Sequence, residues 1–469
     1  MPGSVLPDSV QVAIVGAGPV GLLLAGELSS RGITCAVLER ESRTAQVTRA
    51  LVLHSRTLEY FDMRGMADSF VAAGHPYRHY PLGTARTKAP FAGLDSPFAY
   101  ALALPQYRTQ SLLEAYARAH GALLVRDAEV TGLLQETDGV LLTVRHAGRD
   151  KRLRAGHVAG CDGARGAVRR LTGIPAPHFV YPYDVTSVDA RLDLEPQQPW
   201  SRCGTDGMAI LLPFGDGRWR LILYDYGPPE PDGARAADPA RAAALLRRIA
   251  GRDLALRDVQ WASRYRCERR HATRYRHLRV VLAGDAAHVH PPTGGQGLNT
   301  GIADAMSLGW RLALAVTDPR HDALLDAYAD ERRRAATAVL RLTGALLHLN
   351  AAASPRARAA RTVALHAARL PVVRRHLAAA LAGLSPKVLP AGDRLRSGHR
   401  VPDLPLTAQP AQGRPGRLFE ALRTGDHVHL TPGCGTADPR ADDMAHPLVT
   451  VRSDACRRAC IIRPDGHVL

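Results

Sequence analysis

The chain has 469 residues, of which 46% are hydrophobic, so it is long enough for two or three domains and is not a disordered protein. The formal net charge is +17, but only 5% of the residues are aromatic and no basic run contains interleaved aromatic residues, which argues against a nucleic-acid-binding protein. The seven scattered cysteines match no common zinc or redox spacing and no apolar run is long enough to span a membrane, so we expect a cytoplasmic protein without a metal site.

The first predicted unit covers residues 11–40, where a strand, a glycine turn, a helix and a second strand follow one another. The glycines of GAGPVG allow a tight turn and let the start of the helix approach a pyrophosphate. Glu39 closes the second strand, where a carboxylate can accept hydrogen bonds from ribose hydroxyls. This pattern predicts a bound dinucleotide, either NAD(P) or FAD. The residues assigned to it are Gly16, Gly18, Pro19, Gly21, Glu39 and Arg40.

Residues 112–147 then predict a helix followed by alternating strands, and residues 157–173 predict a strand, a turn and a helix. The sequence pattern changes at 176–275, a segment with many prolines that contains two predicted strands joined by a GDG turn. We expect an antiparallel sheet inserted between two pieces of an α/β domain. Alternate residues of one strand can line a substrate cavity or form ordinary sheet core; they are Met208, Ile210, Leu212 and Phe214.

The α/β character returns at 278–288, where a buried strand delivers Asp285 at its carboxyl end. The turn Pro291–Gly297 then presents backbone N–H groups and the start of a helix. A reduced flavin carries negative charge at its N1–C2=O edge, which a helix N-terminus stabilises, so this turn favours FAD over NAD(P). Residues 321–390 predict helices, and the composition changes once more near residue 391.

Three motifs in this order carry a resemblance to a known family. They are GAGPVG, AGCDGARGAVRR (159–170) and LAGDAAHVHPPTGGQGLNTGIADAMSLGWRLA. The chain resembles the class A FAD-dependent aromatic hydroxylases, which have the fold of para-hydroxybenzoate hydroxylase. Within that family it is most similar to the bacterial aklavinone and angucycline hydroxylases and to rifampicin monooxygenase. The resemblance covers residues 10 to 345 and, more weakly, the end of the chain.

The resemblance implies an α/β fold (α+β overall) in three parts. A discontinuous Rossmann-like FAD domain would comprise residues 1–175 and 276–390, with an antiparallel substrate-binding sheet at 176–275. A small thioredoxin-like module, which we expect to be shortened, would comprise residues 391–469. That module has no redox CxxC in the family, so we expect no redox role for the pair Cys456 and Cys460.

The implied reaction begins when NADPH or NADH, bound transiently, reduces the resident FAD. Oxygen then adds at flavin C4a, and the distal oxygen of the hydroperoxide passes to an electron-rich ring. The flavin supplies this chemistry and the protein supplies orientation and exclusion of water, so no side-chain nucleophile is required. We expect the substrate to be a polycyclic phenolic or quinone polyketide that is hydroxylated by a monomer or homodimer.

The resemblance also implies roles for individual residues. Asp162 and Arg169 would support FAD and transient NADPH, and Pro292 would face the substrate. The FAD contacts carried over from the family are Arg49, Gln106, Asp285, Pro291, Gly295, Gly297, Leu298 and Asn299. Gly166 departs from the small hydroxyl residue usual in the family, which implies a lost polar contact near the pyrophosphate or NADPH.

His288 and His290 are acid–base candidates by residue type, but we expect His288 to pack at the end of its strand. Three other functions remain open: Baeyer–Villiger or ring-cleaving oxygenation, inactivation of an antibiotic of the rifamycin or tetracycline type, and sequestration of a ligand without turnover. A flavin halogenase is disfavoured because the W-x-W-x-I-P element is absent. A disulfide reductase is disfavoured because no C-x₄-C follows the first glycine motif.

Overall fold

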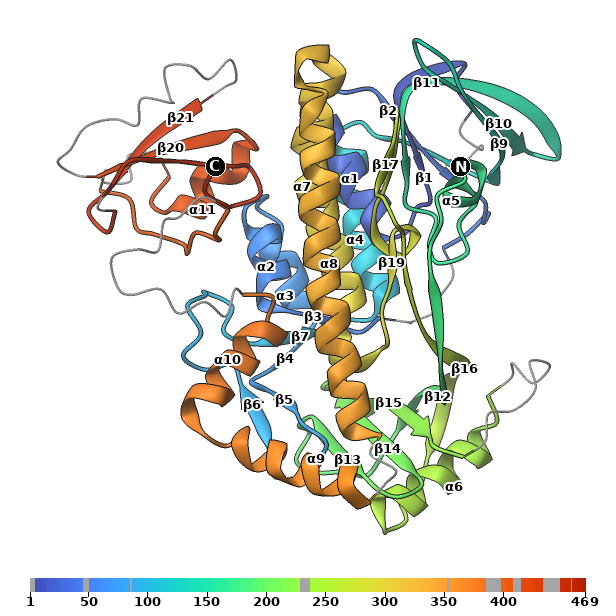
Figure 1. Cartoon of the computed structure of the whole chain (residues 1–469), viewed down its shortest axis with the longest axis vertical. Coiled ribbons are helices and arrows are strands. Elements are labelled where there is room, and N and C mark those ends of the chain that lie inside the picture. The colour runs from blue at the N-terminus through green and yellow to red at the C-terminus, as the bar shows by residue number, and fades with distance from the viewer. Residues whose placement is uncertain are drawn as a thin grey trace.

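The computed structural model of the chain describes residues 5–44, 50–84, 87–227, 237–351, 355–384, 398–407, 415–432, 448–456 and 458–469. Its largest sheet has the strand order β17-β18-β11-β1-β2-β8, with β10 beside β11 and β9 beside β10 (Figure 1). These strands are β1 (Ser9–Val15), β2 (Cys35–Glu39), β8 (Leu123–Arg126), β9 (Ala128–Gln135), β10 (Val140–His146), β11 (Arg149–Gly160), β17 (Arg276–His277) and β18 (Val280–Leu282).

The centre of this sheet is parallel. β1 pairs with β11 and β2, β11 pairs with β18, and β2 pairs with β8, all in parallel. Residues Val12–Val15 of β1 are all buried because helices and loops cover both faces, as is usual for parallel strands. The carboxyl ends of β1, β11 and β18 therefore meet at one edge, where open α/β sheets bind ligands.

Helices that follow or precede these strands cover the sheet. α1 (Pro19–Ser29) begins with a proline at its first position, which suits a residue without an N–H group, and packs against α4 and α7. The long α8 packs along α7 (Figure 1). The remaining helices of the α/β part are α2 (Ser55–Asp62), α3 (Ala67–Ala73), α4 (Gln106–Ala119), α5 (Ala167–Leu171), α7 (Gln296–Thr317), α8 (Ala323–Asn350), α9 (Pro355–Ala367) and α10 (Pro371–Leu381).

Residues 176–275 form most of a second, antiparallel sheet with the order β13-β14-β15-β12-β16-β19. β14 and β15 are joined by the predicted GDG turn, in which Gly215 and Gly217 adopt positive φ. One face of the sheet packs on α6 (Pro239–Ala250), and the other face turns toward the α/β part. Its strands are β12 (His178–Arg191), β13 (Trp200–Cys203), β14 (Gly207–Pro213), β15 (Arg218–Asp225), β16 (Arg257–His271) and β19 (His288–Val289).

Small elements between β2 and α4 were not predicted from the sequence. β3 (Val52–Leu53), β7 (Ala101–Ala103) and β4 (His75–Tyr77) form one short sheet, and β5 (His79–Pro81) pairs with β6 (Lys88–Pro90). Their brevity left no period-two pattern to detect. Short 3₁₀ turns are η1 (Gly284–Ala286), η2 (Thr293–Gly295), η3 (Pro319–His321) and η4 (Leu422–Thr424).

The C-terminal module lies across α8 from the N-terminus (Figure 1). It contains α11 (Leu418–Ala421) and a sheet in which β20 (His427–Pro432) pairs in parallel with β21 (Leu448–Ser453) and antiparallel with β22 (Cys460–Ile462). Its assignment as thioredoxin-like stays a prediction.

Ion pairs join this module to α2, and we call this group the C-terminal seam. Arg417 donates to Asp62 at 2.6 Å and to Asp403 at 2.7 Å, and Arg400 donates to Glu59 at 2.7 Å.

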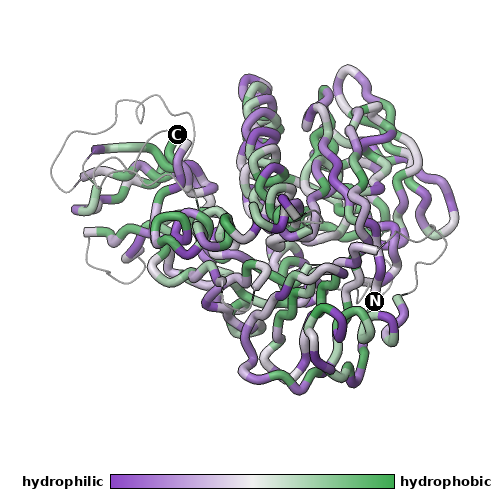
Figure 2. The backbone as a smooth tube through the Cα atoms, turned by 60° about the horizontal axis from the view of Figure 1, so that its bottom comes forward, coloured by the Kyte–Doolittle hydropathy of each residue, from purple (hydrophilic) through white to green (hydrophobic). Residues whose placement is uncertain are grey.

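Hydropathy follows this architecture. Figure 2 shows hydrophobic stretches along the strands and an alternation of hydrophilic and hydrophobic residues along the long helix α8. Among the described residues, every helix is too short or too polar to cross a membrane.

Candidate functional site

The first glycine turn follows β1 and has two kinds of glycine. Gly16 has φ of +104°, and a Cβ added there would lie 2.5 Å from the carbonyl oxygen of Cys161; a Cβ on Gly21 would lie 2.1 Å from the carbonyl oxygen of Gly16. A Cβ on Gly18 would meet no atom within 4 Å. Gly16 and Gly21 therefore allow close packing of the chain itself, whereas Gly18 faces open space at the start of α1.

Glu39 lies beside this turn, as predicted, but its carboxylate already bonds to backbone. Its Oε2 accepts from the N–H of Ala17 at 2.7 Å and its Oε1 accepts from the N–H of Glu41 at 3.0 Å. Each oxygen keeps a second lone pair for a ribose hydroxyl. The neighbouring Arg40 is exposed and contacts the Glu41 carboxylate at 3.1 Å.

The second turn follows β11 and contains Asp162. Its Oδ2 accepts from the N–H of Val168 at 2.9 Å, while its Oδ1 is buried without a hydrogen-bond partner among the described residues. Burial raises the pKa of Asp162, and bonds from backbone N–H groups oppose that rise. A Cβ on Gly166 would lie 2.1 Å from Oδ1. In the described conformation Gly166 thus makes room for the Asp162 carboxylate, which is a reason for glycine that the sequence did not reveal.

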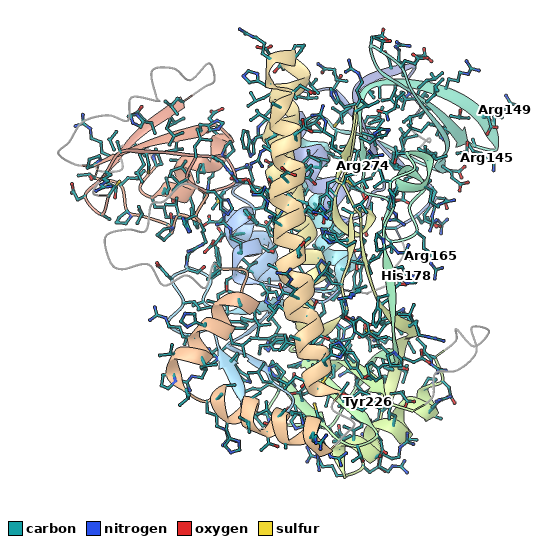
Figure 3. The ribbon with its side chains drawn as sticks, viewed as in Figure 1. Arg145, Arg149, Arg165, His178, Tyr226 and Arg274 are labelled. Carbon is teal, nitrogen blue, oxygen red and sulfur yellow. The ribbon has the colours of Figure 1, made fainter. Side chains whose placement is uncertain are left out.

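Arg169 ties the second turn to the third. Its guanidinium donates to the carbonyl of Ala164 at 3.0 Å and to the carbonyl of Ala286 at 2.9 Å, and its side chain is buried. Arg270 of β16 also donates to Ala164, at 2.9 Å. Burial and then the positive charge of Arg270 lower the pKa of Arg169. Figure 3 labels Arg165, in the same turn, and His178, the first residue of β12.

The third turn follows β18 and holds Asp285 in the short helix η1, with Asp285 exposed at the sheet edge as predicted. Below it lies a buried charge network. Asp304 accepts from the N–H of Gly284 at 3.0 Å, from His288 at 2.6 Å and from Arg332 at 2.7 Å. Burial would raise the pKa of Asp304, but His288 and Arg332 lower it to about 2. The network fixes the end of β18.

His288 is fully buried against Asp304, in agreement with the packing role expected for it. Its Nδ1 lies 2.9 Å from Nε2 of His290, and Nδ1 of His290 is buried without a partner among the described residues. Burial and the neighbouring His288 lower the pKa of His290 well below its ordinary value. The His290 ring is therefore neutral at pH 7.

Residues Pro291–Gly295, which we call the double-glycine turn, link β19 to α7. Gly294 and Gly295 have φ of +82° and +64°. The N–H of Gly294 donates to the hydroxyl of Tyr80 at 3.0 Å, and its carbonyl accepts from His54 at 2.8 Å and from Gln296 at 3.1 Å. The N–H and the carbonyl of Gly294 are thus each held by a side chain from a distant segment, Tyr80 and His54.

Asn299, in the first turn of α7, organises the same region. Its Oδ1 accepts from the N–H of His54 at 2.8 Å and from Thr57 at 2.7 Å, and its Nδ2 donates to the carbonyls of Val52 at 2.9 Å and Gly295 at 2.8 Å. Because all four bonds are to protein groups, we assign the Asn299 side chain a positioning role. A Cβ on Gly297 would meet no atom within 4 Å, so open space faces this end of α7.

The remaining predicted cofactor contacts lie around these turns. Gln106 pairs with the backbone of Ala50, accepting from its N–H at 3.0 Å, and Gln110 donates to the carbonyl of Ala17 at 2.7 Å. Arg49 lies outside the described residues. Pro291 is buried, and Pro292 and Leu298 are partly buried.

An apolar cluster adjoins the double-glycine turn. Met208, Ile210 and Leu212 of β14 belong to it, with the partly buried Phe214 against it, whereas Ala209 and Leu211 face α6. The Tyr224 hydroxyl lies 3.3 Å from that of Thr293, so the cluster reaches the turn. The buried aromatic members of this cluster are Tyr77, Tyr80, Phe91, Tyr181 and Tyr224.

Taken together, the turns after β1, β11 and β18 and the start of α7 form a cradle that fits FAD. Two helix starts face open space at Gly18 and Gly297, and Asp162 and Asp285 lie at the same sheet edge. Sequence reasoning missed His54, Tyr80, Gln110, Asp304 and Arg332. These residues lie outside the short glycine motifs, and their roles depend on contacts between segments far apart in the sequence. A local sequence pattern therefore could not reveal them.

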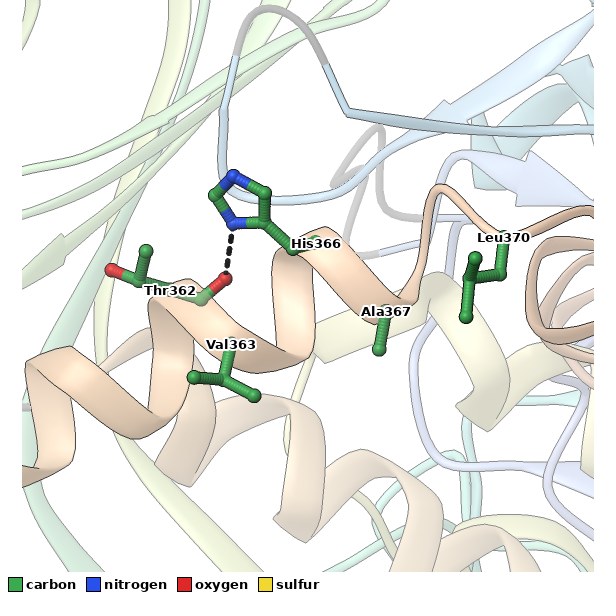
Figure 4. A pocket seen from close by; sticks show the side chains of 5 residues that line it. All are labelled: Thr362, Val363, His366, Ala367 and Leu370. Atoms are coloured by element: carbon green, nitrogen blue, oxygen red, sulfur yellow. Dashed lines mark hydrogen bonds between the residues drawn. The ribbon is translucent and has the colours of Figure 1, made fainter.

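A separate shallow groove lies on α9, away from this cradle. Figure 4 shows Thr362, Val363, His366, Ala367 and Leu370 around it, with His366 Nδ1 donating to the carbonyl of Thr362 at 2.8 Å. The residues predicted for the site do not line this groove.

Comparison with known proteins supports the cradle. Residues 9–343 match the FAD binding domain family. The chain is 35% identical, over 97% of its own length and 94% of the relative's, to the 12-dehydrotetracycline 5-monooxygenase/anhydrotetracycline 6-monooxygenase of Streptomyces rimosus. It is 34% identical to the rifampicin monooxygenase of Streptomyces venezuelae, over 98% and 94% of the two chains.

Solved structures with the same fold include a hydroxylase and a protein with a different named activity. The structure of OxyS anhydrotetracycline hydroxylase from Streptomyces rimosus matches with a TM-score of 0.84 and 34% identity, covering 98% of this chain and 95% of that one. The Diels-Alderase PyrE3 of pyrroindomycin biosynthesis matches with a TM-score of 0.83 and 30% identity, covering 98% and 96%. Similarity of this degree thus includes a protein named for a cyclisation.

Proposed function

The chain belongs to the FAD-binding-domain family of flavin-dependent monooxygenases, and we propose that it hydroxylates a polycyclic aromatic polyketide at the expense of NADPH or NADH. The observation that carries this proposal is the contact between the apolar cluster and the double-glycine turn. Through Tyr80 and Tyr224 the cluster touches both Gly294 and Thr293. A ring system bound among these side chains would therefore lie beside the flavin.

The cluster suits a flat polycyclic molecule because its larger buried side chains are aromatic or long aliphatic groups. One charged pair lies on the same face of the sheet, where Arg220 bonds to Asp189 and its guanidinium lies 4.8 Å from the ring centre of Trp261. Because Asp189 neutralises Arg220, the wall offers polarity without net charge. A phenolic or quinone substrate matches such a wall better than a carboxylic acid does.

When bound, FAD would supply the acceptance of a hydride and the activation of oxygen. Gly18 would give its pyrophosphate access to the start of α1, and Glu39 would accept from its ribose. Asp285 would hold the ribityl hydroxyls. Tyr80 and His54 keep the double-glycine turn in one conformation, so that the ring and the substrate keep a fixed separation.

Positive charge beside the second turn supports transient binding of a nicotinamide dinucleotide. Arg169 and Arg270 converge on the Ala164 carbonyl, and Nε of Arg270 is buried without a partner among the described residues. Guanidinium groups with spare donors bind phosphate well. R270M should raise the KM for NADPH by about tenfold while leaving reduction by dithionite unchanged. R274M, at an exposed arginine labelled in Figure 3, is the matched control and should leave both unchanged.

The proposed function is tested by mixing the flavin-loaded protein anaerobically with NADPH and following flavin bleaching. Anhydrotetracycline or 1,8-dihydroxyanthraquinone should accelerate bleaching, and readmission of oxygen should give a product heavier by one oxygen atom. Acceleration by phenol alone would contradict a polycyclic substrate. A product formed by ring expansion would instead support Baeyer–Villiger oxygenation, and growth protection on expression would support antibiotic inactivation.

A second candidate is a cyclase that uses flavin only as a structural group. The similarity to PyrE3 favours it, since that protein is named as a Diels-Alderase and matches over nearly the whole chain. An apolar wall that orients a reactant without nucleophile or metal also suits a cyclisation. It predicts bound FAD that NADPH does not bleach with any ligand, and no oxygen uptake, which would also fit ligand sequestration without turnover.

A further inference from the structure

The hydroxyl of Tyr80 has an uncommitted proton. Its oxygen lies 3.0 Å from the backbone nitrogen of Gly294, and an amide N–H can only donate. The oxygen therefore accepts this bond, and its own O–H must point elsewhere. Among the residues that the structure describes, Tyr80 has no second hydrogen-bond contact. Leaving a buried donor without an acceptor costs about 1–3 kcal/mol, so this O–H is available to a bound ligand.

The surroundings of Tyr80 are apolar and next to the predicted flavin. Tyr80 is 8% exposed and belongs to the cluster that contains Phe91 and Met208. Burial raises its pKa to about 12, against the bond from Gly294, so the hydroxyl stays protonated at pH 7. A hydroxyl that accepts one bond also becomes a better donor. Tyr80 therefore acts as a donor rather than as a base.

Two other buried tyrosines of the cluster, Tyr77 and Tyr224, differ in this respect. The hydroxyl of Tyr77 donates to the carbonyl of Pro213 at 2.6 Å, so its proton is committed to the protein. The hydroxyl of Tyr224 lies 3.3 Å from the hydroxyl of Thr293, and each can donate to the other. Tyr80 alone among these three contacts a backbone donor and nothing else.

We propose that the Tyr80 hydroxyl donates a hydrogen bond to a phenol or quinone oxygen of the bound polycyclic substrate, and so selects which edge of the ring faces the flavin. This inference rests on the proposed function. The bond from Gly294 sets the position of the Tyr80 hydroxyl oxygen. The oxygen that holds the double-glycine turn would therefore also hold the substrate. A shift of the turn would then move cofactor and substrate contacts together.

The test compares Y80F with Y77F in the FAD-loaded protein, with anhydrotetracycline as the probe and its Kd measured by titration calorimetry. Both variants delete one buried hydroxyl from the same cluster, but only Y80F removes the uncommitted donor. We expect Y80F to weaken probe binding about tenfold and FAD binding by clearly less, because the variant also leaves the N–H of Gly294 without its acceptor. Y77F should lower the melting temperature and leave the Kd of the probe within about twofold, since its proton serves Pro213.

Three results would overturn the inference. An unchanged Kd in Y80F would show that the hydroxyl does not contact the ligand. A loss of FAD affinity in Y80F as large as the loss of probe affinity would show that the hydroxyl serves the turn and the cofactor instead. If the wild type binds neither anhydrotetracycline nor 1,8-dihydroxyanthraquinone, the proposed function fails first and the inference falls with it. Thermal unfolding of each apo variant separates these results from misfolding.

Discussion

The double-glycine turn and the C-terminal seam both rest on buried polar side chains, but the two use different chemistry. At the turn, neutral groups hold backbone atoms: Tyr80, His54 and Asn299 bond to Gly294 and Gly295. At the seam, arginines and carboxylates hold one another, as in the pairs of Arg417 with Asp62 and Arg400 with Glu59.

This difference matches what each region has to do. Hydrogen bonds from neutral side chains to backbone fix one conformation at little desolvation cost, which suits the role that we propose for the turn, to hold the cofactor in place. Ion pairs attach whole elements, and they need every partner, because a buried charge that loses its counterion is costly. We therefore expect changes at the turn to alter ligand binding, and changes at the seam to alter stability with little effect on the cofactor.

The largest effect that sharpens this comparison is expected at the first glycine turn. G21A would place a Cβ 2.1 Å from the Gly16 carbonyl oxygen, so it should cost more than about 3 kcal/mol of stability and abolish FAD binding. G18A is the matched variant, because its Cβ meets only open space. It should keep the melting temperature of the apo protein and weaken FAD binding, as measured by flavin fluorescence. Equal losses of stability in both would contradict the division between the two glycines.

The next largest effect is expected at the seam. Glu59 is fully buried and accepts from Arg56 at 2.9 Å as well as from Arg400, and these arginines keep its pKa low despite burial. E59Q should leave two guanidinium groups uncompensated and lower the free energy of unfolding by about 3–5 kcal/mol in urea denaturation. The Kd for FAD of the folded variant should stay near the wild-type value. A large loss of FAD affinity would break the distinction between seam and turn.

A smaller, pH-dependent effect is expected at His54. Burial lowers its pKa to about 4, against its bond to Gly294, whereas an unfolded histidine titrates near about 6.5. Because the unfolded chain takes up the proton first, the stability from the neutral ring is complete above pH 6.5 and is lost as the pH falls toward 4. The melting temperature and the bound flavin should both decline across that window.

His157 supplies the control for this prediction. Burial, and then Arg279, lower its pKa to about 4 as well, but it lies on β11 and contacts no part of the double-glycine turn. H54Q and H157Q should each flatten the pH dependence of the melting temperature, and only H54Q should weaken FAD binding. Flavin loss of equal size in both variants would show that acid release is a general unfolding effect.

The smallest effect is expected from Arg417, whose side chain is 32% exposed although it contacts three carboxylates. R417M should cost about 1 kcal/mol or less at low ionic strength, because partly exposed ion pairs are screened by water. The difference from wild type should shrink in 0.5 M NaCl. A loss of stability that does not change with salt would show that the ion pairs of Arg417 behave as buried pairs instead.

Local patterns explain which parts of the molecule were predictable from the sequence. The turn at Gly16 and the start of α1 could be predicted because glycine, proline and strand residues follow one another directly. The hydrogen bonds of Tyr80 and His54 to Gly294 could not be predicted, since these two residues lie 214 and 240 residues away along the chain. Gly166 shows a further limit: its motif suggested a missing contact, while the structure shows that any side chain would strike Asp162.

The insertion of residues 176–275 has a consequence for the order in which the protein forms during synthesis. β18 pairs with β11 only after residues 176–275 have left the ribosome, because Val158 lies opposite Val280. Pairing across so long a stretch of chain is slow, and the exposed edge of β11 invites wrong partners meanwhile. The double-glycine turn comes later still, so FAD can complete its cradle only after residue 295 of the 469 has left the ribosome. A shortage of flavin would then act on newly made chains more than on finished ones.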